Sequence, residues 1–204
     1  MVVGQRADVS KHRTIRFVRG DFLKRMTARE ILAASFRELA ENKSIDKITV
    51  KDITENCGYS SATFYRNFKD KYDLIAWEYS NHVSGIMSKI GVDGYSWRNS
   101  LEDGARSFLE RKDYLSNLFL HTSGHDAFIQ YQTEINYNAF RNFVVKSPEQ
   151  TQIDEKTDMY IRLYCLGTVS LTCEWILGKY RASCEEMAEV YENSLPAPLK
   201  KYVY

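Results

Sequence analysis

Proline and glycine are scarce in this sequence, with 3 prolines and 10 glycines among 204 residues. A sandwich or barrel of short strands needs many turns, and turns are rich in these two residues, so their scarcity argues against a β-rich fold. Apolar alternation with a period of two is almost absent, and hydrophobic residues recur at helical spacing instead. The sequence therefore predicts an all-α fold.

Cysteine and histidine patterns that bind metals are also missing. The two histidines His121 and His125 lie four residues apart, but "HTSGH" has no neighbouring carboxylate and contains Gly124, so a zinc-protease motif is not supported. None of the cysteines forms a CxxC pair, and we expect reduced, buried thiols with neither metal nor cofactor. The cysteines are Cys57, Cys165, Cys173 and Cys184.

Long apolar segments are lacking as well. The uncharged run from Leu163 to Cys173 has 11 residues, too short to span a bilayer, for which about 20 are needed. The first residues contain no apolar core of the kind a signal peptide has. We therefore expect a cytoplasmic protein that is not associated with a membrane.

The net charge is only +1, yet charge is unevenly distributed. Residues 1–26 hold 7 basic and 2 acidic residues, whereas residues 27–75 hold 8 of each. We expect residues 1–26 to form a basic, flexible arm. Two interpretations of the arm are open: it reaches a neighbouring minor groove of DNA, or residues 1–25 are a solvated tail or cloning remnant, which is the interpretation that we favour.

Helix signals begin at Thr27, which with Glu30 forms a capping box ahead of "ILAASFRELAEN". This predicts a helix over 27–42, with Leu32, Phe36 and Leu39 on one face. "GVDGYS" and "SPEQTQID" mark breaks between later helices. Those later helices are expected at 71–90, 97–111, 113–120, 125–146, 155–179 and 183–194.

Residues 49–68 read as two short helices joined by a tight turn. Thr49 is an N-cap, Gly58 can take the positive φ of a helix stop, and Ser60 is a second N-cap. Phe64 and Phe68 lie four residues apart and are expected to face inward. The plan is that of a helix-turn-helix, although a helical hairpin that serves only packing has the same plan.

The other side of the second helix carries small and polar residues. Ser61 and Ala62 near its N-terminus would let the helix approach base edges in a major groove. Tyr65, Arg66 and Asn67 would supply contacts to bases and to the phosphate backbone.

The stretch "ITVKDITENCGYSSATFYRNFKDKYDLI" resembles the N-terminal domain of TetR/AcrR-family transcriptional regulators. Four positions depart from the family pattern: Ala62, Phe64, Asn67 and Tyr72. The matching positions are Thr49, Val50, Asp52, Ile53, Gly58, Ser60, Thr63, Tyr65, Phe68, Lys71 and Leu74. The resemblance implies a DNA-binding domain over 27–75 and a helical regulatory and dimerisation domain over 76–204.

The resemblance also implies a role for individual residues. Phosphate contacts would come from Thr49, Ser60, Tyr65 and Lys71. Base-edge contacts would come from Ser61, Ala62, Thr63 and Arg66, with Asn67 near the backbone. Such a protein is a homodimeric regulator, most often a repressor, that binds a palindromic double-stranded operator and is released by a small-molecule effector.

The second half shows neither a nucleophile–base pair nor a phosphate loop, so an enzyme is not expected. Its helix "DMYIRLYCLGTVSLTCEWILGKY" is apolar on nearly all sides, which predicts burial and a partner helix. By the resemblance, the last two helices pair with those of a second copy. The expected interface residues are Tyr164, Gly167, Thr168, Leu171, Trp175, Met187 and Tyr191.

Aromatic residues in this half predict either a ligand pocket or simply a core. The stretch "WILGKYRASCEEMA" resembles regulators related to dihydroxyacetone-kinase control and names no effector. The alternative function is an effector-independent co-regulator whose C-terminal domain binds a protein partner. The candidate pocket residues are Trp77, Phe108, Phe119, Phe128, Tyr131 and Tyr164.

Overall fold

A computed structural model describes residues 26–121, 125–146 and 152–204, without the side chains of residues 121 and 125–128. Within these ranges every regular element is a helix, which confirms the all-α prediction there. The helices are α1 (Ala28–Ala40), η1 (Ile45–Lys47), α2 (Val50–Cys57), α3 (Ser61–Asn67), α4 (Lys71–Met87), α5 (Trp97–Glu110), α6 (Lys112–His121), α7 (His125–Val145), α8 (Glu155–Ile176), α9 (Cys184–Asn193) and α10 (Ala197–Lys200).

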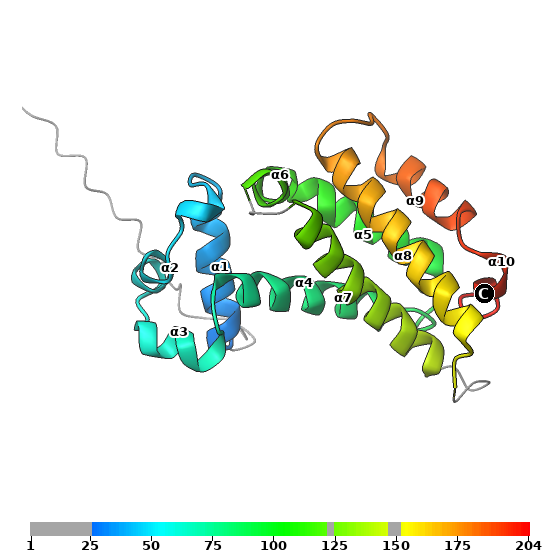
Figure 1. Ribbon diagram of the computed structural model, residues 1–204, viewed down its shortest axis with the longest axis horizontal. Helices are drawn as coiled ribbons and strands as arrows, with labels where there is room; N and C mark the ends of the chain where they lie inside the picture. The colour runs from blue at the N-terminus through cyan, green and yellow to red at the C-terminus, as the bar shows by residue number, and fades with distance from the viewer. Residues whose placement is uncertain (1–25, 122–124, 147–151) are drawn as a thin grey trace, which may run out of the picture.

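The molecule is elongated, with a small head at one end (Figure 1). Helices α1, α2 and α3 form this head, and α4 runs from it into a larger body built from α5 to α10. The boundary that we predicted after residue 75 falls inside α4, which continues unbroken to Met87. One helix therefore connects the head with the body.

The capping signals in the sequence fix the helix ends in the head. Thr27 and Thr49 each form a complete capping box, and the Ser60 side chain accepts a hydrogen bond from the backbone of Thr63. Gly58 has a φ of 74°, a conformation that costs a residue with a Cβ much more. The turn between α2 and α3 is thus specified locally.

Further along the chain the predicted bounds were less accurate. The helices predicted to end at residues 90 and 179 end at Met87 and Ile176. The short elements η1 and α10 were not predicted, because three or four residues are too few to show a periodic pattern.

Helix α6 joins the head to the body at a second point. The Asn117 amide donates to the backbone carbonyl oxygens of Ala40, at 2.8 Å, and Lys43, at 3.1 Å. Ala40 is the last residue of α1 and Lys43 lies just beyond it. The last carbonyl oxygens of a helix have no N–H partner within the helix. A side chain of the body therefore satisfies the C-terminus of a head helix.

Candidate nucleic-acid interface and interior cavity

Helix α3 has one buried face and one exposed face. The side chains of Phe64 and Phe68 are 0% and 2% exposed, and both belong to the main hydrophobic core. On the opposite face Ser61 and Ala62 are exposed, and the Tyr65 side chain is 61% exposed. A buried pair of aromatic rings thus holds the helix while its small and polar residues face solvent.

The side chains at the end of this exposed face are held in place by the helix itself. Arg66 Nη2 donates to Thr63 Oγ1 at 3.0 Å, and Asn67 Nδ2 donates to the Thr63 carbonyl at 2.8 Å. A guanidinium has five N–H donors, so the bond to Thr63 leaves Arg66 able to bind elsewhere. The Asn67 side chain is half-buried and already engaged.

The C-terminus of α3 is also tied to the rest of the head. Arg29 Nη2 donates to the carbonyl oxygen of Asn67 at 2.8 Å, and its guanidinium lies over the rings of Phe68 and Trp77, at 5.1 and 5.7 Å from their centroids. Such cation–π contacts add to the hydrogen bond. One arginine of α1 therefore links α3 to the start of α4.

Lys71 occupies an unexpected place. Its ammonium donates to the carbonyl oxygens of Ile45 (2.8 Å), Asp46 (3.1 Å) and Ile48 (2.9 Å). An ammonium has three N–H donors, so these bonds use all of them. Its pKa is lowered, mainly by burial. In this structure Lys71 holds the segment that leads into α2, and the phosphate contact expected from the sequence stays a prediction.

Replacing Lys71 by methionine tests this structural role. Three carbonyl oxygens would lose a charged donor, so we expect a lower melting temperature for Lys71→Met, by several degrees. The dependence of log K on log salt concentration for DNA binding should keep its slope, because no phosphate contact is lost. A slope reduced by about one, as expected for a missing phosphate contact, with unchanged melting, would contradict the structural role.

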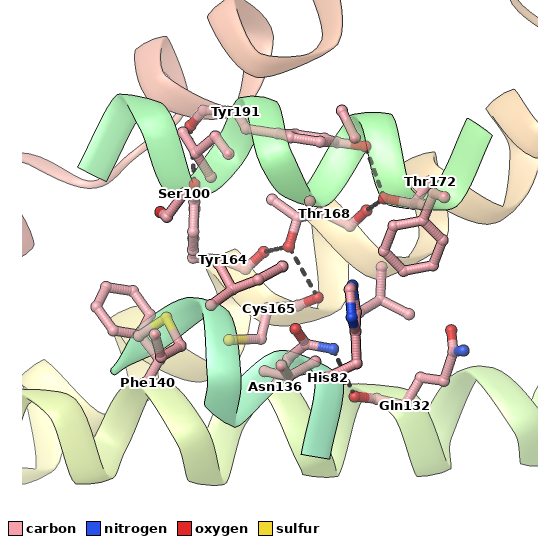
Figure 2. A pocket seen from close by; sticks show the side chains of 18 of the residues that line it. His82, Ser100, Gln132, Asn136, Phe140, Tyr164, Cys165, Thr168, Thr172 and Tyr191 are labelled. Atoms are coloured by element: carbon pink, nitrogen blue, oxygen red, sulfur yellow. Dashed lines mark hydrogen bonds between the residues drawn. The ribbon is translucent and has the colours of Figure 1, made fainter. Parts of the chain in front are cut away.

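A cavity of about 130 Å³ lies inside the body. Figure 2 shows it between helices, with His82 from α4 and Asn136 from α7 on the side that faces residues of α8. Tyr191 of α9 closes another side and is joined to α8 by a 2.6 Å hydrogen bond between its hydroxyl and Thr172 Oγ1. Five helices, α4, α5, α7, α8 and α9, contribute lining residues.

Only part of the predicted pocket lines this cavity. Phe108 and Tyr164 do so. Trp77 packs against Phe68 in the head, Phe119 is buried in the core at 2% exposure, and Tyr131 is 49% exposed. The side chain of Phe128 lies outside the described residues. The cavity lining that the sequence did not single out includes His82, Trp97, Gln132, Asn136 and Phe140.

Most of the predicted interface residues face the interior of their own chain. Tyr164, Trp175, Met187 and Tyr191 are between 3% and 8% exposed, and Thr168 lines the cavity. Leu171 is half-buried and packs against the core. Of the seven, only Gly167 is exposed. The four buried side chains pack within their own chain, and which residues contact a second copy stays a prediction.

A different face of α8 is exposed and apolar. Met159 and Leu163 are each 65% exposed and Leu166 is 46% exposed. Their spacing of four and three residues places them on one side of the helix, next to the exposed Gly167. Val190 of α9 is also exposed, at 48%. Exposed apolar side chains aligned on one helix face are typical of interaction sites.

Two family models match this chain. Residues 31–76, which include α2, α3 and most of α1, match the model described as bacterial regulatory proteins of the tetR family. Residues 95–196, half of the chain, match the transcriptional regulator C-terminal region of the same family. The chain belongs to the TetR family.

One curated protein and two solved structures illustrate what the chain is similar to. The activator DhaS of the dhaKLM operon in Lactococcus lactis is 24% identical over 111 residues, which is 54% of this chain and 59% of that protein. The solved structure of a dihydroxyacetone kinase operon activator DhaS has 21% identity and a TM-score of 0.62, covering 87% of this chain and 98% of that one. The TetR-family repressor AlkX from Dietzia has 19% identity and a TM-score of 0.55, covering 88% and 99%.

The TetR family consists of DNA-binding transcription regulators, so this protein is one and is not an enzyme. The helix-turn-helix of the family is the α2–α3 pair. Within the described ranges no helix is long and apolar enough to cross a membrane, and no group of three or more metal-ligating side chains is found. The predicted basic arm covers residues 1–26, and all of it except Met26 lies outside the described residues.

Proposed function

We propose that this TetR-family regulator acts as a homodimeric repressor that binds a palindromic operator and leaves it when a small molecule fills the body cavity. The observation that carries the proposal is the two-sided α3, anchored by Phe64 and Phe68 and exposing Ser61, Ala62, Tyr65 and Arg66. A protein that binds its operator without effector, and is released by effector, blocks transcription until the effector appears.

The exposed face suggests how DNA is read. Ser61 and Ala62 have short side chains at the start of α3, where the helix can come closest to base edges. We propose that Arg66 and Thr63 also contact base edges, and that Thr49, Ser60 and Tyr65 contact phosphates. Asn67, whose amide is engaged with Thr63, would approach the backbone without being the main contact.

Two substitutions on this face should have different effects. Arg66→Ala should weaken binding to the preferred operator by about 10- to 100-fold while binding to random DNA changes little, because a base contact is lost. Tyr65→Ala should weaken both to a similar degree, because a phosphate contact carries no sequence information. Fluorescence anisotropy with operator and scrambled duplexes measures both. Equal losses on the two duplexes for Arg66→Ala would reject its assignment as a base reader.

The exposed apolar face of α8 is proposed as the contact with a second copy. Met159, Leu163 and Leu166 lie in line on it, and Gly167 leaves room for a close helix approach. A two-fold axis through this surface would present two α3 helices to DNA, so the operator should contain two half-sites related by the same symmetry.

Selection of bound duplexes from a random pool tests the whole proposal. An enriched palindrome would support both the reading helix and the dimer. If no sequence is enriched, the proposal of sequence-specific DNA binding is rejected. A reporter gene placed behind the selected operator then gives the sign of regulation, since a repressor lowers its expression.

A further inference from the structure

The body cavity has room for one small ring. At about 130 Å³ it is close to the size of cavities in proteins that bind benzene, about 150 Å³. Aromatic side chains form much of its wall, including Phe108, Phe140 and Tyr164. The indole of Trp97 stacks on the Phe140 ring, with centroids 5.0 Å apart and an angle of 25° between the planes. Flat, apolar walls of this kind suit a flat ligand.

The described residues that line the cavity include no lysine, arginine, aspartate or glutamate. The one side chain that titrates near neutral pH is His82, and its pKa is lowered by burial and by the positive charges of Arg111 and Lys89. The imidazole is therefore neutral at pH 7. A charged ligand would enter this site without a counter-ion, at a large cost.

Most polar groups in the wall already have partners within the protein. Ser100 Oγ donates to the Trp97 carbonyl at 2.6 Å, and the Tyr164 hydroxyl donates to the Tyr191 carbonyl at 3.0 Å. Thr168 Oγ1 donates to the Tyr164 carbonyl at 2.9 Å. The hydrogen bonds of these hydroxyl groups are satisfied within the protein, so the groups need no ligand as a partner.

Two residues that line the cavity differ from these groups, because each has a buried ring nitrogen without a hydrogen-bond partner in the part of the chain that the structure describes. Among the described residues, Trp97 Nε1 and His82 Nε2 have no hydrogen-bond partner. Trp97 is only 4% exposed, and the His82 ring points into the space between the helices (Figure 2). Buried polar atoms without a partner are rare and costly. By contrast Trp175 Nε1, in the same wall, donates to the Ala182 carbonyl at 2.9 Å.

We infer that the cavity binds an uncharged, single-ring molecule carrying a hydroxyl or carbonyl group, which accepts a hydrogen bond from Trp97 Nε1 or pairs with His82 Nε2. This inference rests on the proposed effector role of the cavity and names the class of effector. A hydroxyl suits both nitrogens, because it donates and accepts. A carbonyl suits the indole N–H.

Four probes of similar size separate the effect of ligand charge on affinity from the effect of a ligand hydroxyl group. Phenol, toluene, benzoate and benzylammonium are titrated into the full-length protein by calorimetry at pH 7, without DNA. We expect phenol to bind with a dissociation constant in the millimolar range or below, and toluene about tenfold more weakly because it lacks the hydrogen bond. Benzoate and benzylammonium should bind at least 100-fold more weakly than phenol.

The tryptophan substitutions provide a matched pair. Trp97→Phe keeps a ring in the wall and removes the unpaired N–H, so the tenfold preference for phenol over toluene should fall to about threefold or less. Trp175→Phe removes an N–H that is already paired within the protein, so the preference should stay near tenfold. His82→Phe, which removes the second unpaired nitrogen, provides a third measurement if Trp97→Phe does not fold.

The outcomes separate this inference from the proposed function. Equal affinity for phenol and toluene, or tighter binding of benzoate, would overturn the inference. Absence of binding by all four probes would overturn it as well, even if the palindrome is enriched and the function stands. Conversely, if the protein binds phenol as expected but the DNA selection enriches no sequence, the inferred ligand class stands and the proposed repressor function is rejected. A separate anisotropy measurement of whether phenol releases the protein from its operator connects the inferred ligand class with the proposed function.

Discussion

Leu163→Glu is expected to turn the protein into a monomer and to weaken operator binding by about 10² to 10⁴-fold. Leu163 lies in the middle of the exposed apolar face of α8 and is 65% exposed. At a two-fold interface the same residue occurs on both copies, so the substitution places two carboxylates in an apolar contact. Without the dimer, each head binds its half-site alone and the gain from simultaneous binding is lost.

Leu120→Glu is the matched control for this experiment. Leu120 is also 65% exposed, but it lies on α6 rather than on the α8 face. The two variants make the same chemical change, so both should fold and melt like the original protein. Light scattering coupled to size exclusion gives the mass, and anisotropy gives the operator affinity. A Leu163→Glu protein that remains a dimer, or a Leu120→Glu protein that dissociates, would reject the proposed interface.

How the head folds was predictable because its signals are local. Thr49, Gly58 and Ser60 each act on backbone groups within three residues, so the ends of α2 and α3 follow from the sequence alone. Phe64 and Phe68 were expected to be buried from their spacing, and they are. Lys71 shows where this reasoning ends, because its partners lie more than 20 residues earlier in the chain.

The body was less predictable, because which face of each helix is buried depends on how five helices pack. Tyr131 and Phe119 have the same aromatic character as Phe108, yet only Phe108 reaches the cavity. Helix α8 is apolar on nearly all sides, so periodicity does not tell its inner face from its outer face. Tyr164 and Leu163 are adjacent in sequence and about 100° apart around the helix axis, yet Tyr164 is buried and Leu163 is exposed.

Glu78 joins head and body through one carboxylate. Its Oε1 forms an ion pair with Arg37 Nε of α1 at 3.1 Å and accepts a hydrogen bond from Arg111 at 2.7 Å. Its Oε2 accepts a hydrogen bond from the Tyr114 hydroxyl at 3.3 Å. The Glu78 side chain is 12% exposed. Burial, and after it the negative charge of Glu78, raises the pKa of Tyr114 well above its usual value, so the phenol stays protonated and donates.

Glu78→Gln should therefore destabilise the protein by about 2–3 kcal/mol. Breaking a fully buried ion pair costs about 3–5 kcal/mol, and the partial exposure of Arg37 and Arg111, at 45% and 25%, reduces that cost. For a chain of this length the melting temperature should fall by about 5–10 °C. Urea unfolding followed by circular dichroism measures the free energy directly.

Glu134→Gln is the control, because it removes the same charge from an exposed pair. Glu134 Oε1 lies 2.6 Å from Arg162 Nη1, a shorter distance than in either ion pair of Glu78. The side chains of Glu134 and Arg162 are, however, 49% and 47% exposed. Solvent screens such a pair, so the loss should be less than about 1 kcal/mol. If the two variants lose equal stability, the Glu78 contacts do not hold head and body together. If only Glu78→Gln is destabilised, burial rather than contact distance determines how much an ion pair contributes to the free energy of unfolding, and the Glu78 contacts stabilise the packing of α1, α4 and α6.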